Sequence, residues 1–207
     1  MISAVIPTLY HPPQLARLLE VLEEDEVEVI LLESGQYDHK IYRMWNAGVA
    51  MAKGEYVAIL NDDITILPGT LPLMAQILEE SQTKSRLGVV YPDQWAPLEE
   101  GLPEKITIQL TTGSARVGGM TGFCFMFRRE LMIPSSGHPD VTAFDERFNW
   151  WFGDDQFEFD VRAKGWGVGR VNGLPLSHQQ STSAERRKDE LGPLILEDQR
   201  LWRQEHG

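Results

Sequence analysis

The sequence predicts a single α/β domain with a mostly parallel central sheet flanked by helices. Short apolar runs rich in Val, Ile and Leu recur along residues 1–92, as is typical of strands buried on both faces of a parallel sheet. Segments with apolar residues at helical spacing separate these runs, which is the alternating order of a doubly wound sheet. The chain has 207 residues, a length that suits one such domain with a sizeable core.

The first half of the chain alternates strands and helices. Strands are expected over residues 2–7, 27–32, 56–60 and 88–92, and a further apolar run over 64–67 is interpreted as another strand of the parallel sheet. Helices are expected over 15–22, 42–53 and 71–78. Gly54 is expected to cap the second helix. Asn46 and Gly48 are poor helix formers within it, and small residues there permit close approach of a ligand or a neighbouring strand.

The second half is less regular. Residues 106–110 are interpreted as an antiparallel strand or a mobile region, and 123–127 as a buried strand followed by a helical turn over 128–132. A helix over 156–164, closed by Gly165, precedes a last short strand over 168–171, and residues 174–178 follow a glycine turn. A mobile polar loop is expected over 181–189. An amphipathic helix is expected over 193–205, with Leu194, Leu201 and Trp202 facing inward.

Composition excludes several classes of protein. The net charge of −12 argues against broad binding to a nucleic-acid backbone and would repel an anionic ligand unless a cation compensated. The single cysteine, Cys124, allows no internal disulfide and no multi-cysteine metal site, and it is expected in the core. No apolar segment approaches the length of a membrane span and no signal-peptide pattern is present, so the expected location is cytoplasmic.

The most informative local feature is the sequence Asn61-Asp62-Asp63, which ends a buried strand. Adjacent carboxylates at such a point are costly unless they are hydrated, paired or bound to a cation. Ligands of open α/β sheets bind beyond the carboxyl ends of the strands, where Glu33 also stands after the strand at 27–32. These residues predict a divalent-metal site for a phosphorylated ligand; a capped turn is the alternative.

An ordered set of segments then resembles a known family. They are 5–8, 31–35, 43–48 with 52–56, 60–63, 122–130 with 144–146, 153–155 with Arg162 and Gly165, and His178. In this order they resemble the inverting, nucleotide-sugar-dependent glycosyltransferases of family 2, which have the GT-A fold. The resemblance implies one Rossmann-like GT-A domain over 1–207, with a small antiparallel part on the acceptor side. Residues 1–92 would form the nucleotide-sugar-binding half, 93–180 the acceptor and catalytic half, and 181–207 a terminal loop and helix.

The resemblance also implies roles for individual residues on the donor side. Asp63 would bind Mn²⁺ or Mg²⁺ together with ligand phosphates, as hard carboxylate oxygens do, and His178 would complete the metal shell. Asn61 stands where the family more often has Asp. The nucleotide sugar would be bound by seven residues: Pro7, Thr8, Glu33, Arg43, Asn46, Asn61 and Asp62.

On the acceptor side, Asp155 is the candidate general base, and Asp154 is its close competitor because counting back from Arg162 shifts the alignment by one residue. A structural alternative is that these acids are only favoured by a helix N-terminus. Trp150 and Trp151 would stack on an acceptor sugar, unless they are core aromatics.

The implied reaction is metal-dependent transfer of a hexosyl or pentosyl group, with inversion, from a UDP- or dTDP-sugar. The acceptor is a hydroxyl of a glycan, a small molecule or a modified nucleic acid, and the sequence leaves a homodimer open. Two alternatives remain. A sugar nucleotidyltransferase would need a Gly- and Arg-rich loop after the first strand, and residues 8–13 contain neither. The other is a non-catalytic module that binds a sugar nucleotide or a glycan.

Overall fold

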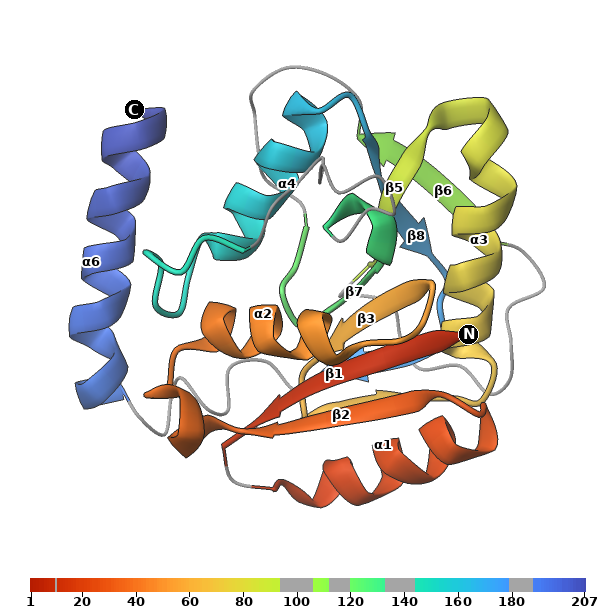
Figure 1. Cartoon of the computed structure of the whole chain (residues 1–207), viewed down its shortest axis with the longest axis horizontal. Helices are drawn as coiled ribbons and strands as arrows, with labels where there is room; N and C mark the ends of the chain where they lie inside the picture. The colour runs from red at the N-terminus through yellow and green to blue at the C-terminus, as the bar shows by residue number, and fades with distance from the viewer. Residues whose placement is uncertain (10, 94–105, 112–119, 133–143, 179–187) are drawn as a thin grey trace.

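The fold is a mixed sheet covered by helices on both faces (Figure 1). The computed structural model describes residues 1–9, 11–93, 106–111, 120–132, 144–178 and 188–207. The seven strands of the main sheet lie in the order β2-β1-β3-β7-β5-β8-β6. Five of them are parallel: β1 (Ile2–Thr8), β2 (Glu28–Glu33), β3 (Tyr56–Leu60), β5 (Leu87–Pro92) and β8 (Gly167–Asn172). The strands β7 (Cys124–Arg128) and β6 (Thr107–Thr111) run antiparallel to their neighbours.

Helices cover the two faces of this sheet with separate cores. Apolar side chains of α1 (Pro13–Glu24) and α3 (Thr70–Ser85) share one buried cluster with alternate residues of β1 and β3. Those of α2 (Ile41–Met51) and α4 (Gly153–Ala163) form the cluster on the opposite face. Successive residues of a strand point to opposite faces, so one buried strand contributes to both clusters. The predicted mostly parallel α/β fold is therefore confirmed.

Most predicted elements are present, and of the two interpretations of 106–110 the antiparallel strand is correct, with β6 at Thr107–Thr111. Cys124 lies in the core as expected, and burial raises the pKa of its thiol to about 12. Most of the loop predicted over 181–189 falls outside the described residues. The terminal helix α6 spans Lys188–His206 and contains Pro193, which was expected at its start. None of the described helices combines the length and apolar character needed to cross a bilayer.

The interpretation of 64–67 as a strand of the parallel sheet was wrong. Here β4 (Ile64–Ile66) pairs antiparallel with β9 (Leu176–His178) in a separate two-stranded sheet. Only three residues separate β4 from β3, whereas a crossover between parallel strands needs a dozen or more. The acidic segment 61–63 therefore lies between two sheets, at the end of β3.

Gly54 does not cap α2, contrary to the prediction. The helix ends at Met51, and Ala52 is its extended C-cap. A Cβ on Gly54 would lie 2.7 Å from the backbone nitrogen of Ser3, and the Gly54 N–H donates to the Ser3 Oγ at 2.8 Å. The glycine is required by close contact with β1, and not by a helix end.

Position 48 requires glycine for a similar reason, and this requirement gives a testable prediction. A Cβ on Gly48 would lie 2.2 Å from Cγ1 of Val5, so α2 could not keep its distance from β1. We expect Gly48→Ala to lower the free energy of unfolding by about 1–3 kcal/mol, as measured by urea denaturation. Gly35→Ala is the matched control because no atom lies within 4 Å of its added Cβ. Equal stability of the two variants would contradict this packing argument.

Candidate active site

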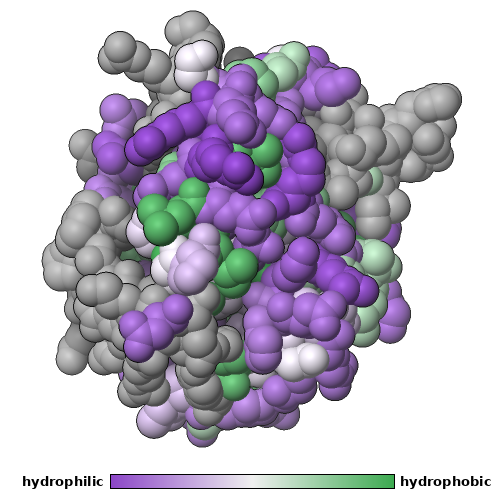
Figure 2. All heavy atoms as spheres, turned by 90° about the vertical axis from the view of Figure 1, so that its left-hand side faces the viewer, coloured by the Kyte–Doolittle hydropathy of each residue, from purple (hydrophilic) through white to green (hydrophobic). Residues whose placement is uncertain are grey.

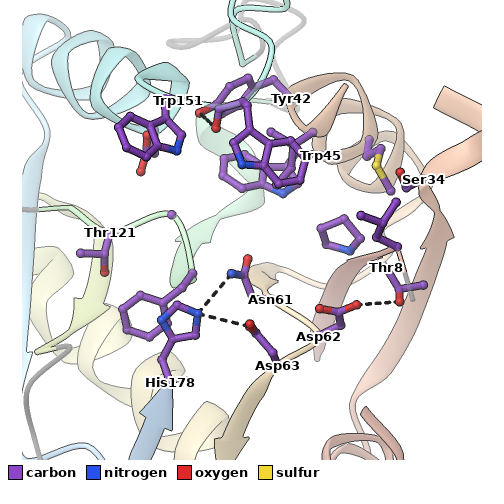
Figure 3. A pocket seen from close by; sticks show the side chains of 18 of the residues that line it. Thr8, Ser34, Tyr42, Trp45, Asn61, Asp62, Asp63, Thr121, Trp151 and His178 are labelled. Atoms are coloured by element: carbon purple, nitrogen blue, oxygen red, sulfur yellow. Dashed lines mark hydrogen bonds and ion pairs between the residues drawn. The ribbon is translucent and has the colours of Figure 1, made fainter. Parts of the chain in front are cut away.

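A cavity of about 460 Å³ lies at the carboxyl ends of β1 and β3 (Figure 3). Parallel strands end at the same edge of a sheet, so residues far apart in the sequence meet there. Nine residues predicted as site residues line this cavity: Pro7, Thr8, Asn61, Asp62, Asp63, Trp150, Trp151, Asp154 and His178. The donor-side and acceptor-side candidates therefore share one cavity.

Asp62 connects the ends of the neighbouring strands β1 and β3. Its Oδ2 accepts a hydrogen bond from the Thr8 hydroxyl at 2.7 Å, and its carboxylate also accepts one from the Leu9 backbone N–H. Burial raises the pKa of Asp62, the Thr8 hydrogen bond opposes this, and the nearby charge of Asp63 raises it further. Asp62 is thus fixed against the loop that follows the first strand and does not project into solvent.

The pairing of β4 with β9 brings His178 to Asp63. In this register Ile64 is opposite His178, and the His178 Nε2 lies 3.2 Å from the Asp63 Oδ1. The imidazole is stacked on the Phe123 ring with a centroid separation of 4.5 Å, and the Asn61 Nδ2 lies 3.4 Å from Nε2. Figure 3 shows His178 and Asp63 facing each other across the end of β3. The sheet register therefore creates a carboxylate–imidazole pair that the two sequence segments do not reveal separately.

This pair fits part of a divalent-metal site. Two ligands at adjacent corners of an octahedron with bonds of about 2.1 Å stand about 3 Å apart, close to the observed 3.2 Å. Within the described residues, no cluster of three or more His, Cys, Asp or Glu side chains is arranged to hold an ion. Mg²⁺ is commonly held by one or two carboxylates together with substrate phosphates and water, so a two-residue set is compatible with an ion that binds with its substrate.

Asp154 and Asp155 occupy the first turn of α4, which begins earlier than the sequence predicted. Burial raises the pKa of Asp154, against hydrogen bonds from backbone groups that include Gly122. Burial, helped by the charges of Asp154 and Glu158, raises the pKa of Asp155 to about 7. A helix N-terminus favours carboxylates, so desolvation exceeds the helix-dipole effect at both positions.

Asp154 lines two adjoining cavities, whereas Asp155 lines only the smaller of them. Asp154 lines the large cavity, and a Cβ on Gly122 would lie 2.8 Å from its Oδ2. Asp155 lines a smaller adjoining cavity of about 210 Å³, together with Asp154 and the three aromatic residues Trp150, Trp151 and Phe152. A carboxylate whose pKa lies near neutrality can accept a proton from a hydroxyl at physiological pH.

Three predicted nucleotide-sugar residues do not line the cavity. Glu33 accepts from the His11 Nε2 at 2.7 Å, and Arg43 donates to Asp38 at 3.0 Å on the exposed surface. Asn46 forms a two-way hydrogen bond with the Phe144 backbone, Nδ2 to O at 2.9 Å and N to Oδ1 at 2.8 Å.

Helical geometry explains why Arg43 does not line the cavity. Each residue of a helix turns by about 100° from the one before it, and α2 directs Tyr42 and Trp45 toward the cavity. Arg43 therefore points elsewhere. No Lys or Arg occurs among the described residues that line the cavity, whereas Asp62, Asp63 and Asp154 are all carboxylates. A diphosphate bound there would need a cation.

Sequence reasoning missed several residues of the cavity wall. Trp45 Nε1 and Thr121 Oγ1 line it as buried polar atoms with no hydrogen-bond partner in the part of the chain that the structure describes. Tyr42 and Trp45 are one helical turn apart, a signal that could have indicated a shared face. Asp198, which accepts a hydrogen bond from the Asn149 backbone N–H, has no comparable sequence signal because this partner lies about 50 residues away in the sequence.

Comparison with known proteins agrees with this fold. Residues 41–133 match the model of glycosyl transferase family 2. The crystal structure of S. aureus TarS superposes with a TM-score of 0.58 and 15% identity, over 95% of this chain and 39% of that chain. Its 1–349 fragment with UDP-GlcNAc has a TM-score of 0.57 and 14% identity, over 95% of this chain and 66% of that one.

The structure of a different protein superposes on this chain about equally well. Glucosyl-3-phosphoglycerate synthase from Mycobacterium tuberculosis, solved with Mg²⁺ and UDP, has a TM-score of 0.57 and 12% identity, over 96% of this chain and 79% of that chain. No match was found among curated proteins. The chain spans 39% and 64% of the first two TarS structures. The predicted resemblance to family 2 glycosyltransferases of the GT-A fold is confirmed.

Proposed function

We propose that this chain, which has the GT-A fold and a family 2 segment at residues 41–133, transfers a sugar from a nucleoside diphosphate sugar to a hydroxyl acceptor. One observation carries the proposal. The Asp63–His178 pair, the Thr8–Asp62 hydrogen bond and Asp154 converge on a single cavity at the carboxyl ends of β1 and β3. The site that would bind the anionic donor thus lies next to a carboxylate that could activate the acceptor.

On the donor side, Asp63 and His178 would hold a divalent cation, Mn²⁺ or Mg²⁺. When bound, such an ion supplies positive charge that stabilises the departing diphosphate. The cavity is lined by carboxylates, and its described lining residues include no Lys or Arg. This composition supports the requirement for a cation beside the diphosphate. Thr8 and Pro7 line the wall where the nucleoside would lie. The structural neighbours solved with UDP support a UDP-sugar, with dTDP as the related alternative.

On the acceptor side, Asp155 takes the proton from the attacking hydroxyl, and Asp154 is the rival for this role. Attack from the face of the sugar opposite to the diphosphate inverts the anomeric centre. Asp155 lines the smaller cavity beside the larger one, and its pKa near 7 suits a base at neutral pH. Asp154 is hydrogen-bonded by backbone N–H groups, which reduces its capacity to accept another proton.

A thermal-shift panel tests the donor site. We expect UDP or dTDP at about 100 times its Kd, with Mn²⁺, to raise Tm by about 5 °C or more, because a ligand that binds only the folded state stabilises it. Omitting Mn²⁺ is expected to remove most of this shift, whereas ADP should give little. Equal shifts with and without metal would contradict the metal assignment. Binding without sugar transfer or donor hydrolysis across an acceptor panel would favour the non-catalytic module.

A further inference from the structure

The smaller cavity carries information about the acceptor. We infer that the space bounded by Trp150, Trp151, Phe152, Asp154 and Asp155 is a subsite for an uncharged sugar ring, and that Asp198 of α6 positions it. The inference rests on the proposed function, because it names the acceptor class of the same site. It also assigns a task to α6, which is not represented among the described residues that line the two cavities.

The side chains around this cavity suit a carbohydrate. Its volume is about 210 Å³, and three of the five described residues that line it are aromatic. Trp151 is 43% exposed, unusual for so large an apolar side chain, and thus offers a ring face to a ligand. A sugar ring has an apolar C–H face that can cover an indole. Its hydroxyl groups can donate to the carboxylates of Asp154 and Asp155.

The charges of the cavity decide between classes of sugar. Among the described residues that line it, Asp154 and Asp155 are the only ionisable ones, and none is a cation. The nearby Arg147 donates to Asp145 and Glu205, so its charge is already balanced by two carboxylates. A phosphorylated or carboxylated acceptor would meet like charge in a partly desolvated space. An uncharged sugar would meet only hydrogen-bond acceptors and aromatic faces.

Asp198 does not line this cavity, but it holds the loop that carries Trp150 and Trp151. The residue is fully buried and accepts hydrogen bonds from three successive backbone N–H groups, those of Asn149, Trp150 and Trp151, at 2.8, 2.8 and 2.9 Å. The Asn149 Nδ2 also donates to it at 3.0 Å. Successive N–H groups around a carboxylate fix the backbone direction of a loop, because each bond is charge-assisted. The orientation of both tryptophans therefore depends on a residue of α6.

Two further contacts, one aromatic and one a hydrogen bond, hold the same loop. Trp202 of α6 is stacked on Phe152 with a centroid separation of 5.6 Å, and the Tyr42 hydroxyl of α2 donates to the Trp150 carbonyl at 3.1 Å. Figure 1 shows α6 beside the loop that leads into α4. The side of the molecule that α6 occupies is mainly hydrophilic among its described residues, with a few separate apolar ones (Figure 2). Trp202 of α6 is thus packed against the loop that leads into α4.

Titration of the protein's tryptophan fluorescence with sugars tests the inference without requiring catalysis. With UDP and Mn²⁺ present, we expect methyl glycosides of neutral hexoses to change the emission saturably at millimolar concentration. Hexose 6-phosphates and phosphoglyceric acid are expected to bind at least about 10-fold more weakly, because they face two carboxylates. Because Trp151 is itself a fluorophore, Trp151→Ala is measured by isothermal titration calorimetry, and we expect its sugar Kd to rise at least about 10-fold relative to the unmodified chain.

Asp198→Asn tests the positioning role, with Asp189→Asn, the same change at an exposed position of α6, as the matched control. An amide has one acceptor oxygen and would turn N–H groups toward backbone donors, so the loop should loosen. We expect the sugar Kd, or the acceptor KM once transfer is measured, to rise about 10-fold in Asp198→Asn and to stay unchanged in Asp189→Asn. The thermal shift with UDP and Mn²⁺ should be retained in both, because the donor cavity does not touch Asp198.

Three results would overturn the inference: no saturable response to any neutral glycoside, tighter binding of the phosphorylated sugars, or an unchanged sugar Kd in both Trp151→Ala and Asp198→Asn. Loss of donor and acceptor binding to the same extent in Asp198→Asn would reduce that residue to a structural role. Failure of the proposed function itself appears separately, as the absence of any shift with UDP and Mn²⁺ in the unmodified chain.

Discussion

Replacing Asp63 by Asn is expected to abolish the metal-dependent part of the stabilisation by UDP or dTDP and to reduce sugar transfer by about 10³-fold or more. Asn keeps the shape of the side chain but removes the negative charge that faces His178 at 3.2 Å. A cation that neutralises a leaving diphosphate contributes several kcal/mol to the transition state, and each 1.36 kcal/mol corresponds to about a tenfold change in rate. Thermal shifts with and without Mn²⁺, and initial rates of UDP release, measure the two effects.

The matched control is Glu80→Gln, the same kind of change at an exposed carboxylate of α3 that hydrogen-bonds only with Gln76 among the described contacts. It should leave the nucleotide shift and the rate unchanged. His178→Ala should weaken the metal response in the same direction as Asp63→Asn, because both would hold the ion. A full metal-dependent shift in Asp63→Asn would show that the cation, if required, is held elsewhere.

Replacing Asp155 by Asn is expected to lower kcat/KM by about 10²–10⁴-fold, the range for loss of a general base. The pKa of Asp155 is raised to about 7, chiefly by burial and then by Asp154 and Glu158. A base must be deprotonated to act, so the rate of sugar transfer by the unmodified chain should rise as pH increases through about 7 and level off above it. Asp155→Asn should lose this acid limb, as measured by kcat/KM from pH 5 to 9.

Asp154→Asn decides between the rival acids. If Asp155 is the base, Asp154→Asn should retain more activity and should shift the acid limb to lower pH, because one of the charges that raises the Asp155 pKa is gone. If Asp154→Asn instead loses both the rate and the acid limb while Asp155→Asn keeps them, the roles are exchanged. Both outcomes are compatible with a carboxylate base, and only persistence of the limb in both variants excludes these residues.

The same pKa shift implies a stability effect of definite sign. The pKa of Asp155 in the folded chain lies above the ordinary value of 3.8 for an aspartate, so the folded chain holds this proton more tightly. The folded state therefore binds more protons than the unfolded state between about pH 4 and 7, and stability falls as pH rises through this window. Asp155→Asn should consequently be more stable than the unmodified chain at pH 8, with the difference shrinking toward pH 4. Urea denaturation at the two pH values measures this.

Local sequence determined the elements and the chemical character of the site. Alternating apolar runs and helical spacings predicted the order of strands and helices, because burial on one or both faces imposes a period that a single sequence displays. Carboxylates placed directly after apolar runs predicted where a polar site would lie, since parallel strands end at one edge. The positions of Asp62 and Asp63 at the end of β3 follow from this alone.

The tertiary structure decided which side chains meet. The register of β4 with β9 sets His178 against Asp63, and the turn of α2 directs Trp45 into the cavity and Arg43 away from it. The contacts of Asp198 with residues 149–151 link segments almost 50 positions apart. Periodicity records only whether a residue faces a core. Register, helix rotation and long-range hydrogen bonds depend on how whole elements pack, and a single sequence carries no local pattern for them.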